Sequence, residues 1–196
     1  MGKRLFDIFF SLIGLIILFI PFLIIAILIS IDSTGGVFYK QTRVGKDAID
    51  FGLFKFRSMS SDSDKSGLLT VGGRDSRITK IGYSLRKYKI DELPQLINVL
   101  CGDMSLVGPR PEVRKYVDLY NSEQKNVLSI KPGITDYASI EYSNENELLG
   151  NAINPEEVYI NEIMPAKLKL NLKYIAEKGF GTDLKIVFRT IKKIVR

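Results

Sequence analysis

The feature that most constrains the fold is a run of 24 residues without a charge, from Ile8 to Ile31. At ~1.5 Å per residue, a helix of this length matches the ~30 Å hydrocarbon core of a bilayer. A cleaved signal peptide is disfavoured, because the run is too long and no small-residue cleavage site follows it. The run therefore predicts a membrane helix next to a domain built from the remaining residues.

Pro21 lies near the middle of this run, where it removes a backbone hydrogen bond and bends or breaks a helix. Basic residues flank both ends of the run: Lys3 and Arg4 before it, and Lys40, Arg43 and Lys46 after it. The positive-inside tendency places both ends on the cytoplasmic face. We therefore expect residues 1–34 to form a re-entrant membrane helix broken at Pro21. A proline-kinked helix that spans the bilayer is the alternative.

The C-terminus carries a second membrane signal. Apolar residues recur there at helical spacing: Leu184, Val187, Phe188, Ile191, Ile194 and Val195. Basic residues occupy the other positions: Lys185, Arg189, Lys192, Lys193 and Arg196. This pattern predicts an amphipathic helix that lies on an anionic bilayer. Docking of the same stripe on the protein's own core is equally consistent with it.

Residues 35–196 are expected to form one membrane-associated catalytic domain. The weak alternation from Val37 to Met59 predicts a hairpin, and Ser58 to Arg77 reads as a lid or a disordered loop. Helices are predicted over 81–88, 92–100 and 112–128 and in the final 30 or so residues, with interruptions at Gly102 and at 179–181. The expected fold class is α+β: a compact, mostly helical domain with a small β-hairpin or sheet, a re-entrant N-terminal helix and interfacial amphipathic helices.

The residue content excludes several chemistries. The chain has 28 basic and 22 acidic residues and no histidine, so Ser-His-Asp hydrolysis, Cys-His proteolysis and His-ligated zinc are excluded. The lone Cys101 cannot form an internal disulfide, which fits a reducing compartment, and we interpret it as a small packing residue. A P-loop enzyme is disfavoured because no Gly-x-x-x-x-Gly-Lys-Ser/Thr motif occurs.

Asp91 and Glu92 stand together at the expected start of a helix, within a basic stretch that runs from Ile78 to Pro111. Helix capping is the simplest interpretation of such a pair. However, Arg110 lies between two prolines, so its backbone is stiff and its guanidinium can be aimed at a phosphate. A helix N-terminus also offers N–H groups to phosphate, and a carboxylate there can hold Mg²⁺ or attack phosphorus.

Six motifs occur in order along the chain: Lys3-Arg4-x-Phe6-Asp7, Phe54-Lys55-Phe56-Arg57-Ser58-Met59, Asp91-Glu92-Leu93-Pro94-Gln95, Gly102-Asp103-Met104-Ser105, Gly108-Pro109-Arg110-Pro111 and Lys131-Pro132-Gly133-Ile134-Thr135. With them the chain resembles the bacterial sugar transferase family, the monotopic phosphoglycosyl transferases, and among these the small members with one re-entrant helix. The resemblance covers nearly the whole sequence.

The resemblance implies a reaction at the cytoplasmic face of the bacterial inner membrane. A UDP-sugar gives its phosphosugar to polyprenol (undecaprenyl) phosphate and UMP leaves, as the first membrane step of surface glycan synthesis. It also implies residue roles: Asp91 as nucleophile and Mg²⁺ ligand, Glu92 as its dyad partner in proton transfer, Lys55, Arg86 and Arg110 as phosphate contacts, and Pro21 as the break in the re-entrant helix. The sequence does not fix the oligomeric state, and a homodimer is one arrangement that it allows.

The sequence departs from the family pattern after Thr135, where Gly-Trp-Ala-Gln is usual and Asp136-Tyr137-Ala138-Ser139 stands instead. The sugar is therefore left unassigned. A non-catalytic protein that binds anionic lipid or a partner at the membrane surface is the main alternative function. A nucleic-acid partner is disfavoured, because no recognised binding motif occurs and tryptophan is absent.

Overall fold

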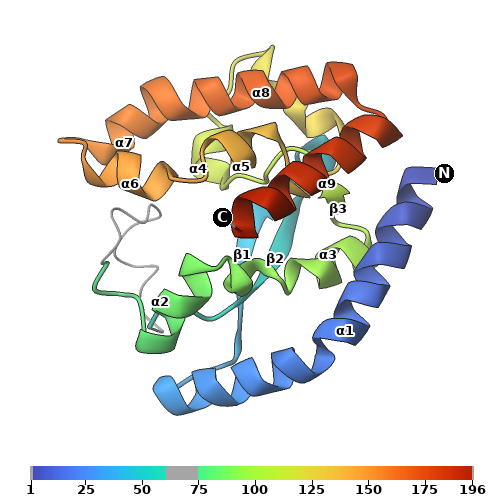
Figure 1. Cartoon of the computed structure of the whole chain (residues 1–196). Coiled ribbons are helices and arrows are strands. Elements are labelled where there is room, and N and C mark those ends of the chain that lie inside the picture. Colours follow the sequence, from blue (N-terminus) through green and yellow to red (C-terminus); the bar gives the residue numbers. More distant parts are fainter. Residues whose placement is uncertain (1, 61–74, 196) are drawn as a thin grey trace.

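The computed structural model describes residues 2–60 and 75–195, apart from the side chains of residues 194 and 195. Most of the predicted loop from Ser58 to Arg77 lies outside the described residues. Figure 1 shows a mostly helical molecule with two small sheets, which agrees with the expected mixed fold class. The long N-terminal helix α1 lies along one side of it, and helices α8 and α9 lie along another.

Helix α1 spans Gly2–Asp32 and continues through Pro21. It is long and apolar enough to cross a membrane, and only 6% of its most apolar window is buried inside the protein. Figure 1 shows that it changes direction along its length. A bend is what an internal proline produces, because its ring displaces the preceding turn and it cannot donate a backbone hydrogen bond. The helix is therefore bent but not interrupted.

The N-terminal end of α1 is held by polar contacts to the domain. Lys3 Nζ lies 2.5 Å from Asp183 Oδ2 and donates to the carbonyl of Val107 at 3.0 Å. Arg4 donates to the carbonyls of residues 99 and 100, and Asp7 Oδ1 accepts the backbone N–H of residue 106 at 3.0 Å. The two basic residues that the sequence offers as topology signals thus also attach α1 to the domain.

The C-terminal end of α1 is attached to the same domain. The buried Arg57 donates to the carbonyls of Ser33 and Thr34 at 2.7 and 2.8 Å, next to the last turn of the helix. Asp32 Oδ2 accepts the backbone N–H of Ile81 at 2.9 Å. A guanidinium is well suited to this place, because carbonyls at a helix end lack intrahelical partners and carry partial negative charge.

The predicted hairpin is confirmed. Strands β1, Phe38–Val44, and β2, Asp50–Phe56, pair antiparallel, and Tyr39 lies opposite Lys55. The predicted helices that follow are also present as α2, Lys80–Lys87, and α3, Gln95–Cys101. Gly102 ends α3 with φ of 100°, as its position in the sequence suggests. Cys101, however, is exposed and is not a packing residue.

The prediction of one helix over residues 112–128 is wrong. The segment contains α4, Arg114–Val117, and a 3-10 helix η4, Gln124–Ser129. Between them Asn121 and Gln124 each accept the other's backbone N–H through their side chains, at 2.8 and 2.9 Å. Such a reciprocal pair starts a new helical turn, which is why the helical pattern does not continue through it.

A second sheet, which the sequence does not predict, consists of β3, Ser105–Val107, and β4, Gly133–Thr135. The strands are parallel, with Ser105 opposite Gly133 and Val107 opposite Thr135. Short helices α5, Tyr137–Glu141, and α6, Glu145–Gly150, follow β4. The sheet brings the segments that follow its two strands to the same edge.

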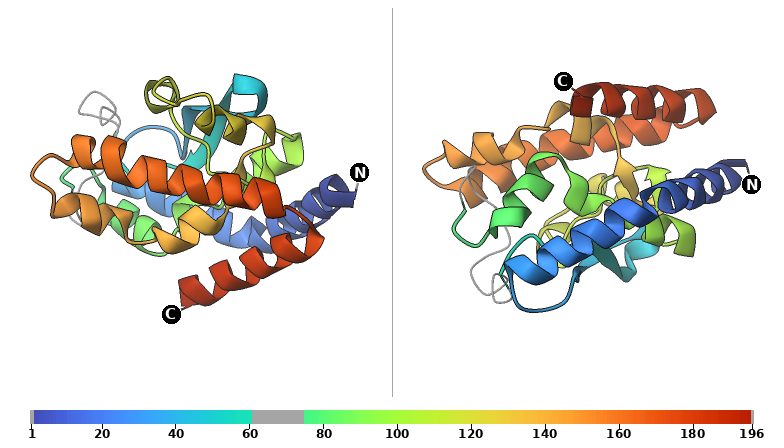
Figure 2. Two further views of the ribbon diagram at one scale, coloured as in Figure 1. Left: turned by 90° about the horizontal axis from the view of Figure 1, so that it is seen from above. Right: turned by 60° about the horizontal axis from the view of Figure 1, so that its bottom comes forward.

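The C-terminal part is helical, as predicted. Helix α7, Pro155–Val158, leads through a π-helical turn η5, Tyr159–Ile163, into α8, Met164–Glu177, and α9, Phe180–Val195, follows. Figure 2 shows α9 turning back from the end of α8 and diverging from it, with its start near the N-terminus of the chain. Ile186 of α9 is fully buried, whereas Phe188 and Ile191 are exposed. One face of α9 thus docks on the core while the other faces outward.

Candidate active site

Asp91 and Glu92 lie in a 3-10 turn, η3, Ile90–Glu92, between α2 and α3. Pro94, rather than Asp91, occupies the N-cap position of α3, and no side chain caps that helix. Lys89, directly before η3, has a left-handed backbone with φ of 57°. Non-glycine residues in this conformation cluster at functional sites. Because Pro94 holds the N-cap position of α3, the interpretation of Asp91 as the cap of that helix is wrong.

Asp91 is 4% exposed, and its Oδ1 has no hydrogen-bond partner among the residues that the structure describes. Burial raises the pKa of Asp91 above the usual range, and the charge of Glu92 raises it further. Lys55, Arg86 and Lys89 act in the opposite direction. A buried acceptor without a donor is rare and calls for an explanation such as a ligand or ion.

Glu92 is bound by two cations. Arg110 Nη1 donates to Oε2 at 2.9 Å, Arg110 Nη2 donates to Oε1, and Lys55 Nζ lies 3.3 Å from Oε1. Burial alone would raise the pKa of Glu92, but the charges of Arg110 and Lys55 and the guanidinium hydrogen bond outweigh it and hold this pKa well below the usual range. Glu92 is therefore ionised, with both oxygens engaged.

Lys55 reaches the site from β2, which is fixed to α3 by a buried amide. Asn98 Oδ1 accepts the backbone N–H of Phe54 at 2.9 Å, and its Nδ2 donates to the carbonyl of Gly52 at 2.8 Å. Asn98 is fully buried and thus ties the strand that carries Lys55 to the helix that follows Glu92. Burial lowers the pKa of Lys55, although Glu92 opposes this shift.

Arg110 is carried by the segment after β3, and two glycines explain how that segment is packed. A Cβ on Gly133 would lie 2.0 Å from the backbone nitrogen of Gly108, and a Cβ on Gly108 would lie 2.6 Å from the carbonyl oxygen of Lys131. Only residues without a side chain allow the two backbones to approach so closely. The Gly-Pro-Arg-Pro and Lys-Pro-Gly motifs are thus two sides of one packing contact.

Both ends of the Arg110 segment are held by carboxylates. Asp136 Oδ2 accepts the backbone N–H of Arg110 at 3.2 Å. Glu112 Oε1 accepts from Arg43 at 2.9 Å, and Glu112 Oε2 accepts from the hydroxyl of Tyr159. Burial would raise the pKa of Glu112, but Arg43 and its other partners lower it overall. The segment is therefore anchored to the hairpin, to η5 and to the start of α5.

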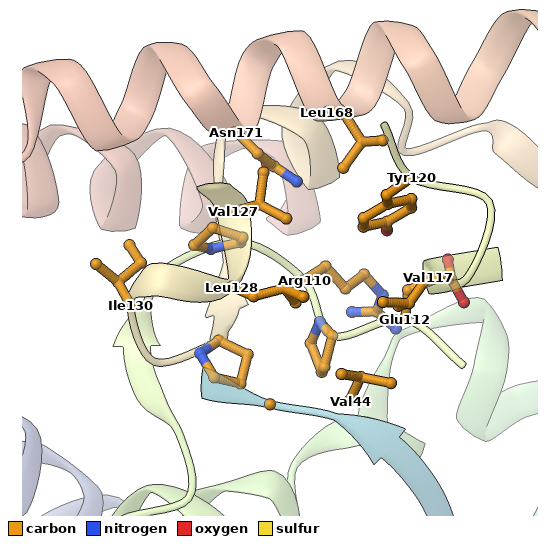
Figure 3. A pocket seen from close by; sticks show the side chains of 14 residues that line it. Val44, Arg110, Glu112, Val117, Tyr120, Val127, Leu128, Ile130, Leu168 and Asn171 are labelled. Atoms are coloured by element: carbon orange, nitrogen blue, oxygen red, sulfur yellow. The ribbon is translucent and has the colours of Figure 1, made fainter. Parts of the chain in front are cut away.

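Figure 3 shows a cavity behind this segment, between the prolines that flank Arg110 and helix α8. Its volume of about 20 Å³ is enough for one water molecule but not for a substrate. Asn171 lines it and is 5% exposed, and its Oδ1 accepts no hydrogen bond from the described part of the chain. The cavity therefore lies in the packing that supports the Arg110 segment, and it is not a substrate-binding pocket.

The structure brings together five of the six residues singled out in the sequence. Asp91, Glu92, Lys55 and Arg110 form one cluster, and the charge of Arg86 on α2 is close enough to lower the pKa of Asp91. Pro21 belongs to α1 and is not part of this cluster. Asn98 was not predicted as a site residue, and Asp136 was assigned no role from the sequence. The signal for Asn98 was a polar residue within an apolar helix, and the signal for Asp136 was a departure from the family motif.

The carboxylates also allow a test of the expected Mg²⁺. Mg²⁺ in phosphate-binding sites usually takes one or two protein carboxylates together with phosphate oxygens and water. The free, buried Oδ1 of Asp91 fits such a ligand, whereas both oxygens of Glu92 are engaged by cations. The donor set thus fits the ion through Asp91, and metal binding stays a prediction.

The comparisons with known proteins identify the family of the whole chain. The family model described as bacterial sugar transferase matches residues 1–196. A UDP-N-acetylgalactosamine-undecaprenyl-phosphate N-acetylgalactosaminephosphotransferase from Aeromonas hydrophila is 38% identical over 98% of this chain, which spans 43% of that protein. A UDP-glucose:undecaprenyl-phosphate glucose-1-phosphate transferase from Escherichia coli (strain K12) is 34% identical over 97% of this chain and 39% of its own length.

A shorter relative matches over most of its own length. The uncharacterized sugar transferase EpsL of Bacillus subtilis (strain 168) is 37% identical over 98% of this chain and 87% of that protein. The chain thus spans less than half of some relatives and most of another. The match over all 196 residues shows that the chain belongs to the bacterial sugar transferase family.

Proposed function

We propose that this protein is a phosphoglycosyl transferase, which moves a phosphosugar from a UDP-sugar to polyprenol phosphate and releases UMP. Family membership and the names of the Aeromonas and Escherichia relatives support this class of reaction. The observation that carries the proposal is Asp91, a buried carboxylate with a free oxygen, surrounded by the charges of Lys55, Arg86 and Lys89.

The first step is attack by Asp91 on the phosphorus that bears the sugar. A new bond forms between the carboxylate oxygen and this phosphorus, the bond to the UMP oxygen breaks, and UMP leaves with the electron pair. The Oδ1 of Asp91 would hold Mg²⁺, which when bound offsets the negative charge of the diphosphate. Arg86 and Arg110 would supply further positive charge to the diphosphate.

The second step regenerates Asp91. An oxygen of polyprenol phosphate attacks the same phosphorus, the Asp91–phosphorus bond breaks, and the carboxylate is released. We assign the proton of the incoming phosphate to Glu92. In the free protein Glu92 is a weak base, because Arg110 and Lys55 neutralise it. It becomes a stronger base when these cations turn toward the substrate phosphates, since its pKa then rises.

The arrangement of α1 supports a re-entrant helix and a location at the cytoplasmic face. Contacts at Lys3 and Asp7 attach one end of α1 to the domain, and contacts at Asp32 and Arg57 attach the other end. A helix that crosses the bilayer would have its ends on opposite sides, about 30 Å apart along the membrane normal. Nucleotide sugars are cytoplasmic, so the domain would face that side.

The test of the proposed function is UMP release from UDP-sugars by the Asp91→Asn variant. The amide is a poor nucleophile toward phosphorus, so we expect turnover to fall by at least about 10³-fold. Wild-type protein incubated with donor alone should carry a phosphosugar adduct on Asp91, which intact-protein mass spectrometry detects. Normal turnover by the variant, or an adduct on another residue, would overturn the assignment.

A non-catalytic membrane-surface protein is the second candidate, favoured by one observation. Helix α9 exposes two apolar side chains, Phe188 and Ile191. The same helix carries the basic residues Lys185, Arg189 and Lys192. Such a face binds anionic lipid. It gives no reason for the free oxygen of Asp91, and UMP release that depends on Mg²⁺ would exclude a purely non-catalytic role.

A further inference from the structure

Asp136 is buried at the junction between β4 and α5, where it binds two segments at once. It is fully buried, its Oδ1 accepts the backbone N–H of Ser139 at 2.6 Å, and its Oδ2 accepts the backbone N–H of Arg110 at 3.2 Å. The first contact caps α5, a task for which a neutral serine or asparagine would suffice. The second contact, and the charge, require another explanation.

The charge of Asp136 acts on Arg110. Glu92 contributes most to raising the pKa of Arg110, and Asp136 raises it further. A fully buried carboxylate is costly unless it is hydrogen-bonded and close to a cation, and Asp136 meets both conditions through Arg110 and Ser139. Arg110 is thus held between two carboxylates, one at its side chain and one at its main chain.

The residue before Asp136 is hydrogen-bonded to two neighbouring segments. The carbonyl of Thr135 accepts the backbone N–H of Gly108 at 3.1 Å, and the hydroxyl of Thr135 lies 2.6 Å from that of Thr190 in α9. The segment that carries Arg110 and the segment that carries Asp136 are therefore fixed to each other before any substrate binds. A carboxylate in this position can fix the main chain of Arg110 accurately.

We infer that Asp136 is a positioning residue for Arg110, and that it holds the arginine main chain in place while the guanidinium moves from Glu92 to a substrate phosphate. The inference rests on the proposed function, in which Arg110 binds the diphosphate of the donor. It concerns a position where the sequence departs from the usual family pattern, because the glycine that is usual there offers no side-chain oxygen to Arg110.

A double-mutant cycle tests this inference. Asp136→Asn and Asp136→Ser are made in the wild-type and in the Arg110→Ala protein, and kcat/KM for UMP release and the Kd for UDP are measured. Both substitutions keep an acceptor for Ser139, so α5 stays capped, but they remove the charge of Asp136. We expect each to lower kcat/KM about tenfold in wild-type protein, which corresponds to one hydrogen bond to a charged group. In Arg110→Ala the loss should be less than about twofold.

A matched control separates positioning from general structural damage. Asp7 is also a buried carboxylate that accepts a backbone N–H, from Leu106, together with the hydroxyl of Ser105. Asp7→Asn should change kcat/KM by the same factor with and without Arg110. Thermal midpoints of all variants identify any that fail to fold, and Asp136→Ser remains informative if Asp136→Asn does so.

The outcomes distinguish the two proposals. Equal losses from Asp136→Asn and Asp136→Ser in the wild-type and Arg110→Ala proteins would overturn the role of Asp136 and leave the proposed function intact. Absence of UMP release by wild-type protein with every nucleotide sugar would overturn the proposed function. The UDP affinities still test the coupling in that case, because they do not require turnover.

Discussion

Asp91, the proposed nucleophile, occupies a position that disfavours its charged form. Its pKa is raised by burial and by the neighbouring charge of Glu92. The folded protein therefore binds the Asp91 proton more tightly than the unfolded chain does. This contribution to stability is complete below the unfolded pKa of ~4 and is lost as the pH rises through the higher folded pKa.

We predict that Asp91→Asn stabilises the protein at neutral pH by about 0.5–2 kcal/mol, since the cost of a buried charge is removed. The difference from wild type should shrink as the pH falls from the raised pKa of folded Asp91 toward about 4, and it should be smallest below about 4, where Asp91 is protonated in both states. Urea unfolding at several pH values measures it. Asp118→Asn, at an exposed carboxylate, is the control and should show little change. A variant less stable than wild type at pH 7 would contradict the expectation.

The raised pKa of Asp91 also gives the direction of the pH dependence of catalysis. The proposed nucleophile must be ionised to attack phosphorus, so kcat/KM should fall as the pH decreases through this raised pKa.

Glu92 and the substrate phosphates compete for the same cations. We therefore predict that Glu92→Gln binds UDP about tenfold more tightly, because Arg110 and Lys55 lose their carboxylate partner, while turnover falls about 10²–10⁴-fold without the proton acceptor. Calorimetry and UMP release measure the two effects. Asp50→Asn removes the same unit charge from an exposed pair with Arg114 and should leave UDP affinity unchanged. Weaker UDP binding by Glu92→Gln would show that Glu92 organises the cations for the ligand.

Sequence patterns located the charged residues of this site but not those that hold them. Clustered charge and family motifs pointed to Asp91, Glu92, Lys55 and Arg110. Asn98 contacts a backbone N–H 44 residues away, and Asp136 contacts one 26 residues away. No local pattern encodes such contacts, because they depend on which segments the fold brings together.

At the scale of elements, prediction succeeded where several turns or alternations repeat. The hairpin, α2, α3 and the C-terminal helices were found from their periodicity. Strands β3 and β4 were missed because three residues are too few to show an alternation. The segment over 112–128 was mistaken for one helix because its buried aromatic and aliphatic residues resemble a helical stripe. In the structure they pack on the core through two short elements.

The orientation of α1 is open to a direct labelling experiment. In a Cys101→Ser background, which removes the exposed native thiol, Gly2→Cys and Gly36→Cys place one thiol near each end of α1. A Cβ fits at both positions, where the closest contact is 3.5 Å. We expect an impermeant maleimide to label both in inverted membrane vesicles and neither in intact spheroplasts. Labelling of one of them in spheroplasts would mean that α1 spans the bilayer.

At the scale of the whole molecule, the site and the apolar surfaces belong to one connected body. Lys3 of α1 contacts Asp183 of α9 and the hydroxyl of Tyr174 in α8, and the rings of Phe6 and Phe180 meet edge to face at 5.4 Å. Helix α3, which follows Glu92, packs on α1, where a side-chain atom of Leu96 lies close to Gly14. The candidate active site is thus attached to the same helix that carries the exposed apolar surface.

Because α1 is attached at both ends, its response to a change in bilayer thickness should differ from that of a free spanning helix. A free spanning helix adjusts its tilt when the acyl chains become longer or shorter. A helix whose two ends are bound to one rigid domain keeps a constant immersion, and the lipids must adapt instead. UMP release in nanodiscs of short-chain and long-chain phosphatidylglycerol should therefore agree within about twofold. A steep optimum at one chain length would show that α1 shifts within its attachments.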